Sequence, residues 1–167
     1  PRLEALSLSH EPSPWMGDRQ TFQLMPVPGS APPSADRTAR AASFDHAHET
    51  ALPYRYAVTL DNGITAEIAP TDHAAIMRFT YPGDAGQIAL DNLNDHGRVT
   101  IASDGLSADG YTDVASGLST GSTRMFVHLE FDRPATAQGR MTGQKRDDVQ
   151  AWAAFDTSAR KTVTVRI

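Results

Sequence analysis

The chain has 167 residues, which is long enough for one domain with a sizeable core. Hydrophobic residues make up 40% and charged residues 21%, as in an ordinary globular domain, and the net charge of −5 argues against a nucleic-acid partner. No apolar run approaches the ~18 residues that are needed to span a bilayer. The lack of cysteine excludes disulfides, thiolate metal sites and cysteine catalysis.

The stretch SHEPSPWMGD, residues 9–18, places a tryptophan in a loop that two prolines stiffen. Pro12 and Pro14 fix their own φ and push the residues before them toward extended conformations. Such a loop loses little entropy on binding, and an aromatic face can stack on the apolar face of a sugar. Trp15 is therefore either a ring presented to a ligand or a lid folded back over the core, and the residues alone leave both readings open.

Residues 26–43 are rich in proline, serine and alanine and are expected to form a loop. Beyond them the chain alternates between strand-like and turn-like segments. The Asn62-Gly63 pair between 54–60 and 64–69 predicts a type I′ hairpin, because both central residues of that turn need positive φ. Further strand-like runs occupy residues 74–81, 86–91, 98–103, 124–131, 149–155 and 161–167.

The run 124–131 shows the clearest two-residue periodicity. Met125, Val127, Leu129 and Phe131 share one face, while the residues between them are mostly polar. No segment reads as a helix of about ten residues or more. Many short strands punctuated by Gly, Pro, Asp and Asn indicate an all-β fold, an antiparallel β-sandwich.

The segment DHAHE, Asp45 to Glu49, carries two histidines in alternation. If it is extended, His46 and His48 point to one face, a spacing at which neutral imidazoles can chelate zinc or nickel. The alternative is a polar strand entrance with hydrogen-bonded histidines. Two ligands do not make a site, so the polar strand is the favoured reading.

The segment DNLND, Asp91 to Asp95, is rich in oxygen atoms of the kind that bind calcium. Leu93 occupies a position that an EF-hand loop gives to a ligand, and Asp and Asn simply favour turns. A turn is therefore expected here. The sequence also contains no Gly-x-Ser-x-Gly elbow and no phosphate-binding loop.

Four segments, in this order, resemble the N-terminal domain of glycoside hydrolase family 92, the calcium-dependent, exo-acting α-mannosidases of bacteria. They are LSHEPSPWMGDRQTFQLMP, SFDHAHETALPYRYAVTLDNGITAEIAPTDHAAIMRFTYP, QIALDNLND and FVHLEFDRP, and together they span most of the chain. The chain departs from the family pattern at Tyr54 and Arg55, where glycine and tyrosine are usual. A second departure is Ala47, where the family's Phe-Ser-His-Glu has its glutamate.

The resemblance implies that residues 1–167 are an N-terminal, supersandwich-like β-sandwich, truncated at both ends and cut from a larger two-domain protein. The catalytic (α/α)₆ barrel, which carries the acid, the base and most or all of the calcium ligands, is absent from this chain. We therefore expect no catalytic and no metal-binding residue here, and no activity of the chain alone. The parent is expected to be an inverting α-mannosidase that prefers α-1,2 linkages.

Within this resemblance, Trp15 is expected at the rim of the substrate pocket, against the leaving sugar. His10 and Asp18 are expected to bind substrate beside it. His46 and Glu49 are expected to serve the interdomain contact or the structure. The expected partners are the catalytic barrel and a mannose-containing glycan, calcium is expected in the parent enzyme, and the expected location is secreted, periplasmic or cell-surface.

Two other readings stay open on the residues alone. The chain is then either a stand-alone carbohydrate-binding sandwich or a small β-rich enzyme complete in itself. The accessory-domain reading makes a separate structural prediction: a sandwich that normally packs on a barrel keeps an exposed apolar patch for that contact.

Overall fold

The computed structural model describes residues 1–11, 19–92, 96–113, 124–141 and 149–167. These residues form two antiparallel β-sheets, and the helix among them is one short turn, α1 (Arg37–Arg40). The prediction of an all-β antiparallel sandwich is confirmed. Within the described ranges, no helix has the length and apolar character needed to cross a membrane.

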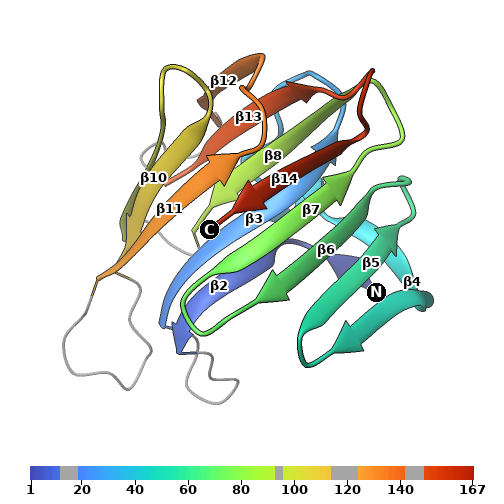
Figure 1. Ribbon diagram of the computed structural model, residues 1–167, viewed down its shortest axis with the longest axis horizontal. Coiled ribbons are helices and arrows are strands. Elements are labelled where there is room, and N and C mark those ends of the chain that lie inside the picture. Colours follow the sequence, from blue (N-terminus) through green and yellow to red (C-terminus); the bar gives the residue numbers. More distant parts are fainter. Residues whose placement is uncertain (12–18, 93–95, 114–123, 142–148) are drawn as a thin grey trace.

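The larger sheet has nine strands in the order β1-β4-β5-β6-β7-β14-β11-β10-β9. In chain order these strands are β1 (Arg2–Leu3), β4 (Ala42–Leu52), β5 (Arg55–Leu60), β6 (Thr65–Pro70), β7 (Ala75–Thr80), β9 (Gly97–Ile101), β10 (Ser107–Thr112), β11 (Met125–Phe131) and β14 (Thr162–Arg166). The last strand, β14, therefore lies in the interior of the sheet, between β7 and β11 (Figure 1).

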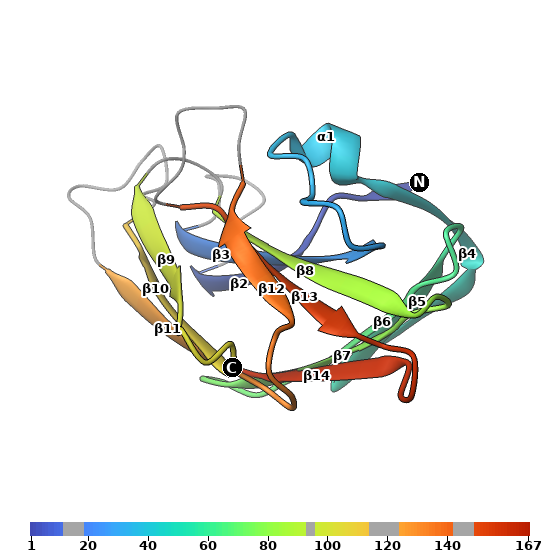
Figure 2. The same cartoon turned by 90° about the horizontal axis from the view of Figure 1, so that it is seen from above.

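The smaller sheet has five strands in the order β12-β13-β8-β3-β2. In chain order they are β2 (Leu6–Glu11), β3 (Arg19–Pro28), β8 (Ala85–Asp91), β12 (Ala137–Arg140) and β13 (Ala151–Asp156). The two sheets lie one over the other, with the smaller sheet as the middle layer beneath α1 (Figure 2).

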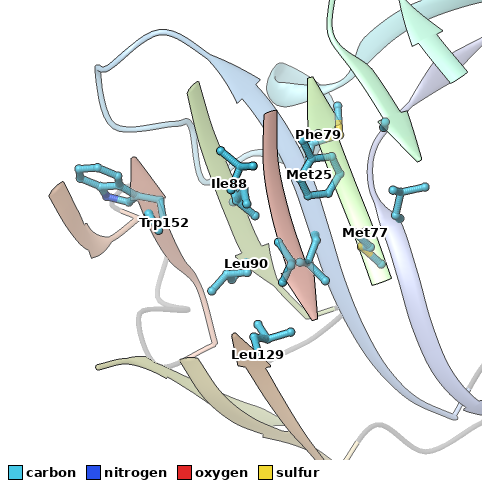
Figure 3. Close-up of a cluster of buried hydrophobic side chains, with 14 of the residues drawn as sticks. Met25, Met77, Phe79, Ile88, Leu90, Leu129 and Trp152 are labelled. Carbon is cyan, nitrogen blue, oxygen red and sulfur yellow. The ribbon is translucent and has the colours of Figure 1, made fainter. Parts of the chain in front are cut away.

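The main core lies between the sheets, where strand alternation brings apolar side chains from both layers together (Figure 3). Met77 and Phe79 of β7 and Ile88 and Leu90 of β8 are fully buried there. On β11, which β14 separates from β7, Leu129 is buried, as its place in the alternating run predicts. Each such side chain contributes about 1.5–3 kcal/mol when it leaves water.

The predicted hairpin between β5 and β6 is confirmed, but its turn differs from the prediction. Gly63 N donates to Leu60 O at 2.8 Å, and Leu60 N donates to Ile64 O at 2.8 Å. The loop therefore has three residues with Asp61 and Asn62 at its centre, and Gly63 follows at φ +84°. Only the glycine needs the left-handed region, so this is a turn with a bulge glycine and not a two-residue I′ turn.

Residues 29–41, which we call the strap, cross the outer side of the smaller sheet (Figure 2). Gln87 Nε2 donates to Gly29 O at 2.9 Å and to Ala31 O at 2.7 Å, and Gln150 Nε2 donates to Ala35 O at 3.1 Å. The strap therefore covers the outer face of β8, six of whose seven residues are buried.

The loop predicted for residues 26–43 is shorter than expected. Strand β3 runs on to Pro28, a helical turn follows at Arg37–Arg40, and β4 begins at Ala42. Proline is tolerated in β3 because the pairing with β2 extends only as far as Leu24, so this part of β3 is paired on one side, where a missing N–H matters least.

Candidate functional site

One end of the sandwich collects strand ends from both sheets. Glu11 pairs with Arg19 across β2 and β3, and Thr112 of β10 pairs with Gly97 on one side and with Met125 on the other. We call this the 12–18 end. The segments whose flanking residues lie here are residues 12–18, 93–95, 114–123 and 142–148.

Asn92 joins the two sheets at the 12–18 end. Its Nδ2 donates to Thr112 Oγ1 at 3.0 Å and to His96 O at 3.1 Å, and its Oδ1 accepts from Thr21 Oγ1 at 3.4 Å. His96 O also accepts from Asp113 N at 2.8 Å. Asn92, Thr21 and Thr112 are buried, so these bonds replace the water that the side chains lose and fix the strand ends relative to one another.

Arg124 stands beside this network on the solvent side. Its guanidinium makes two bonds to the Asp113 carboxylate, at 2.8 and 2.7 Å, and lies 3.8 Å from the centre of the Tyr111 ring. The bond from Arg124 holds the pKa of Asp113 below its usual range. The guanidinium is thus oriented by a carboxylate and an aromatic face together.

A buried ion pair fixes the strap near the same end. Arg40 Nη2 lies 2.6 Å from Asp91 Oδ2, and both side chains are almost wholly buried. Arg40 Nη1 donates to Ser34 O at 2.7 Å and to Ala35 O at 2.8 Å. Asp91 Oδ1 accepts from Asn92 N at 2.7 Å, so the ion pair also restrains the residue that organises the 12–18 end.

A second polar cluster lies on β4 and β5. His46 Nδ1 is 2.5 Å from Glu49 Oε2, and the Tyr56 hydroxyl donates to Glu49 Oε1 at 2.7 Å. The cluster sits on a bulge, because the pairing of β4 with β5 shifts between Phe44 and Glu49. The His46 side chain is 73% exposed and that of Glu49 is 22% exposed. The bonds from His46 and Tyr56 lower the pKa of Glu49.

Tyr56 gives this cluster a measurable pH signature. Burial first, and then the bond to Glu49, raises the pKa of Tyr56 to about 12, from about 10 in an unfolded chain. Because the folded pKa is raised, the stabilisation is complete below pH ~10 and is lost as the pH rises toward ~12. We expect Tyr56→Phe to flatten the fall in unfolding free energy between pH 9 and 11, and Tyr54→Phe, on the exposed turn, to leave it unchanged. Urea titrations at pH 9 and pH 11 measure the unfolding free energy. If the unfolding free energy of Tyr56→Phe falls between these pH values as much as that of the unmodified protein, the prediction is wrong.

Several carboxyl groups of the described residues are held in their ionised form. Glu49, Glu67, Asp113 and Asp156 all have a pKa below the usual range, because histidine, arginine or serine donors bond to them. The general acid of a glycosidase needs the opposite, a raised pKa, so that it holds a proton near neutral pH. None of these four groups is suited to that role.

The sequence-predicted site residues fall into two sets. Trp15 and Asp18 lie outside the described residues, and His10 has its backbone in β2 but its side chain also lies outside the described part. His46 and Glu49 are described and are bonded to each other. The pair lies in β4, on the half of the strand that extends from the bulge toward the 12–18 end.

The sequence offered two candidate metal-binding segments, DNLND and DHAHE. In DNLND, the carboxylate of Asp91 forms an ion pair with Arg40, and residues 93–95 lie outside the described part. In DHAHE, His46 uses Nδ1 on Glu49, consistent with the favoured polar-strand reading. Across residues 1–11, 19–92, 96–113, 124–141 and 149–167, no three His, Asp or Glu side chains gather as a metal site would need.

Comparison with known proteins decides the family. The sequence profile described as the glycosyl hydrolase family 92 N-terminal domain matches residues 1–167. The chain belongs to this family. No curated protein sequence matches this family-92 domain.

Solved structures match the family-92 domain over nearly its whole length. The inverting mannosidase of family GH92 from Bacteroides thetaiotaomicron VPI-5482 has 26% identity and a TM-score of 0.87, over 99% of this chain and 24% of its own. A family GH92 α-mannosidase from Bacteroides thetaiotaomicron matches 87% of this chain and 23% of its own, at 22% identity and a TM-score of 0.66, which shows the fold. The chain thus spans about a quarter of the length of these structures.

Sequence reasoning missed the residues that organise the 12–18 end of the family-92 domain. Arg40 and Asp91 are far apart in the chain, and so are Asn92 and Thr112. One signal was present: Gln87 and Asp91 interrupt an otherwise apolar strand, and a polar side chain in such a run needs a partner once it is buried. The pattern predicts that Gln87 and Asp91 are hydrogen-bonded, but it does not predict which residues bond to them.

Proposed function

We propose that this chain is the accessory N-terminal domain of an exo-acting, inverting α-mannosidase that acts on α-mannosides, preferably α-1,2-linked. The observation that carries the proposal is the match of the whole chain to the family-92 N-terminal domain, joined to 26% identity with an inverting mannosidase over 99% of the chain. The lowered pKa values of Glu49, Glu67 and Asp113 argue against these three groups as the catalytic acid.

In this proposal the 12–18 end contributes to the rim of the substrate pocket. Trp15 stacks on the leaving sugar, while His10 and Asp18 bind hydroxyls or order the loop. The C-terminal catalytic domain supplies a carboxylic acid that protonates the leaving oxygen and a carboxylate that activates water on the opposite face. Calcium, if bound, would be held mostly or wholly by residues of that domain and would supply a cation for mannose hydroxyls. The enzyme works outside the cytoplasm on mannose-containing glycans.

The Trp15→Ala variant of the full-length protein tests this role. We expect kcat/KM on α-1,2-mannobiose to fall about ten- to a hundredfold through loss of one aromatic contact, with an almost unchanged melting temperature. Phe126→Ala is the matched control, because this ring on β11 is 76% exposed. Proton NMR of the first sugar released should show inversion at the anomeric carbon.

Two outcomes would contradict the assignment. A stability loss of about 3–5 kcal/mol in Trp15→Ala, with normal activity per folded molecule, would make the ring a core lid. Release of mannose by the 1–167 chain alone, abolished by mutating one of its own carboxylates, would make this domain an enzyme in itself.

A further inference from the structure

The β4–β5 hairpin has an outer half that contacts the main core only through the half-buried Tyr56. Residues 45–57, which we call the arm, run from the bulge in β4 through the turn into β5, and none of their side chains is buried. By contrast, β7 and β14 of the same sheet bury every second side chain. Beyond the pairing of Tyr56 with Ile68 of β6, the hairpin is joined to no further strand among the described residues, and a two-stranded segment of this kind is marginally stable in water.

The tip of the arm is apolar as well as exposed. Leu52 is 43% exposed and Tyr54 is 68% exposed, and Pro53 between them is also exposed. Three exposed apolar side chains in succession at a turn form a continuous patch, whereas single exposed apolar residues are ordinary. No other segment of the described part of the chain covers this patch.

The long edge of the arm is equally open. Strand β1 pairs with β4 only at Ala42 and Ser43, so from Asp45 onward the outer edge of β4 has no partner strand among the described residues. An unprotected edge of this length readily pairs with another chain segment. The edge therefore offers backbone donors and acceptors beside the apolar tip.

The arm nevertheless has bonds that fix its shape. Glu49 is bonded by both His46 and Tyr56, Asp45 Oδ1 accepts from Ala47 N at 2.8 Å, and Arg55 reaches Glu67 of β6. These bonds hold the bulge and the base of the arm, where Tyr56 is the one arm residue that also packs against the main core. A surface fixed in this way before contact loses less entropy when it binds.

We propose that the arm is the surface on which the C-terminal catalytic domain of the same family-92 polypeptide packs, with an apolar patch over Leu52–Tyr54 and a backbone or polar segment along the edge of β4. The inference rests on the proposed function for the existence of that domain. In the inverting mannosidase, about three quarters of the chain lies outside the matched region, so a large body is tethered to this fold. Tethering gives a neighbour in the same chain a high effective concentration.

The position of the arm agrees with this partner. Tyr56 pairs with Ile68, and Pro70 of the same strand pairs with Ala75, which bonds the backbone of Ile167 in turn. The tip of the arm therefore points to the same side of the larger sheet as the end of β14, whose Arg166 pairs with Glu130 of β11. The 12–18 end lies toward the same side but four strands across the sheet from β5, so a partner the size of a domain is needed to reach the arm and the rim residues together.

Hydrogen exchange on the full-length protein tests the proposal. We expect the amides of residues 45–56 to be protected, and the double variant Leu52→Ser/Tyr54→Ser to speed their exchange about ten- to a hundredfold, the range of interface hot-spot residues. The double variant should also make the two domains unfold in two separate thermal transitions. The matched control is Phe126→Ser/Ile76→Ser, which removes two exposed apolar side chains from the same sheet. The control should neither speed amide exchange in the arm nor separate the two transitions. Such exposed changes alter the domain's own stability little.

Three results would overturn the proposal: rapid exchange of the arm in the unmodified protein, an equal effect of the control, or protection that rises with protein concentration together with a dimeric mass by light scattering. The last would identify a second copy as the partner. Mannose release is measured in parallel on the unmodified protein. An inactive protein with a protected arm would refute the mannosidase function and leave the domain contact standing.

Discussion

Replacing Arg40 with methionine should lower the free energy of unfolding by about 3–5 kcal/mol, the largest effect expected of a single substitution in this domain. The reason is the burial of Asp91, whose carboxylate lies 2.6 Å from Arg40 Nη2 with both side chains nearly inaccessible to water. Methionine keeps the length of the side chain but removes the closest charge partner of a buried anion. It also removes the donors that Arg40 gives to the strap at Ser34 and Ala35.

Two controls separate charge from packing in this experiment. Arg37→Met removes a cation whose Nε lies 3.6 Å from Asp91 and whose side chain is 22% exposed, so it should cost much less. The double variant Arg40→Met/Asp91→Leu should regain a large part of the loss, because an apolar pair replaces a buried charge pair at little net cost. Urea unfolding measures all three variants. A double variant no more stable than Arg40→Met would show that strap packing, and not the carboxylate, sets the penalty.

Replacing Asn92 with alanine should have the second-largest effect, with a consequence for function. The substitution removes a buried donor to Thr112 and His96 and an acceptor for Thr21, and each lost partner of a buried group costs about 1–3 kcal/mol. We expect a total loss of about 3 kcal/mol. In the full-length protein kcat/KM should fall as well, because Asn92 fixes strand ends at the proposed pocket rim.

Asn62→Ala is the control for this variant. Asn62 is an exposed residue of the β5–β6 turn at the opposite end of the sandwich, and its side chain accepts one part-buried bond, from Ile64 N at 3.1 Å. It should cost under about 1 kcal/mol and leave kcat/KM unchanged. Chemical denaturation and steady-state kinetics on both variants test the pair. Equal kinetic effects of Asn62→Ala and Asn92→Ala would contradict a special role for the 12–18 end.

The sequence identified strands that bury one face or both, such as β11 and β8, and missed most of β4 and all of β12, which bury little. The alternation of Val127, Leu129 and Phe131 predicts β11 and its buried face correctly. Strand β4 carries no such period, because its outer half is exposed on both faces, and so only its entrance was recognised. Strand β12 has two exposed residues followed by two half-buried ones and gives no alternating signal either. Apolar runs and alternation report burial on one face or on both, and neither pattern is present where a strand is exposed on both faces.

The candidate site was less predictable than the fold, for a different reason. His46 and Glu49 are three residues apart, which in a regular strand puts them on opposite faces, and they meet because the bulge shifts the pairing between Phe44 and Glu49. Arg40 and Asp91 meet only because the strap crosses β8, and no local rule places those segments together. The family pattern supplied Trp15 as a rim residue, and that assignment stays a prediction.

The place of β14 in the larger sheet has a consequence for biosynthesis. The strands before it form β1-β4-β5-β6-β7 on one side and β11-β10-β9 on the other, and β14 joins β7 to β11. A nascent chain on the ribosome therefore cannot close the sheet until residues 162–166 have left the exit tunnel. Until then the edges of β7 and β11 both stay open to pairing with other chains. During synthesis, the strands on the two sides of β14 can therefore pair within each group first, and the larger sheet closes only when β14 inserts between β7 and β11.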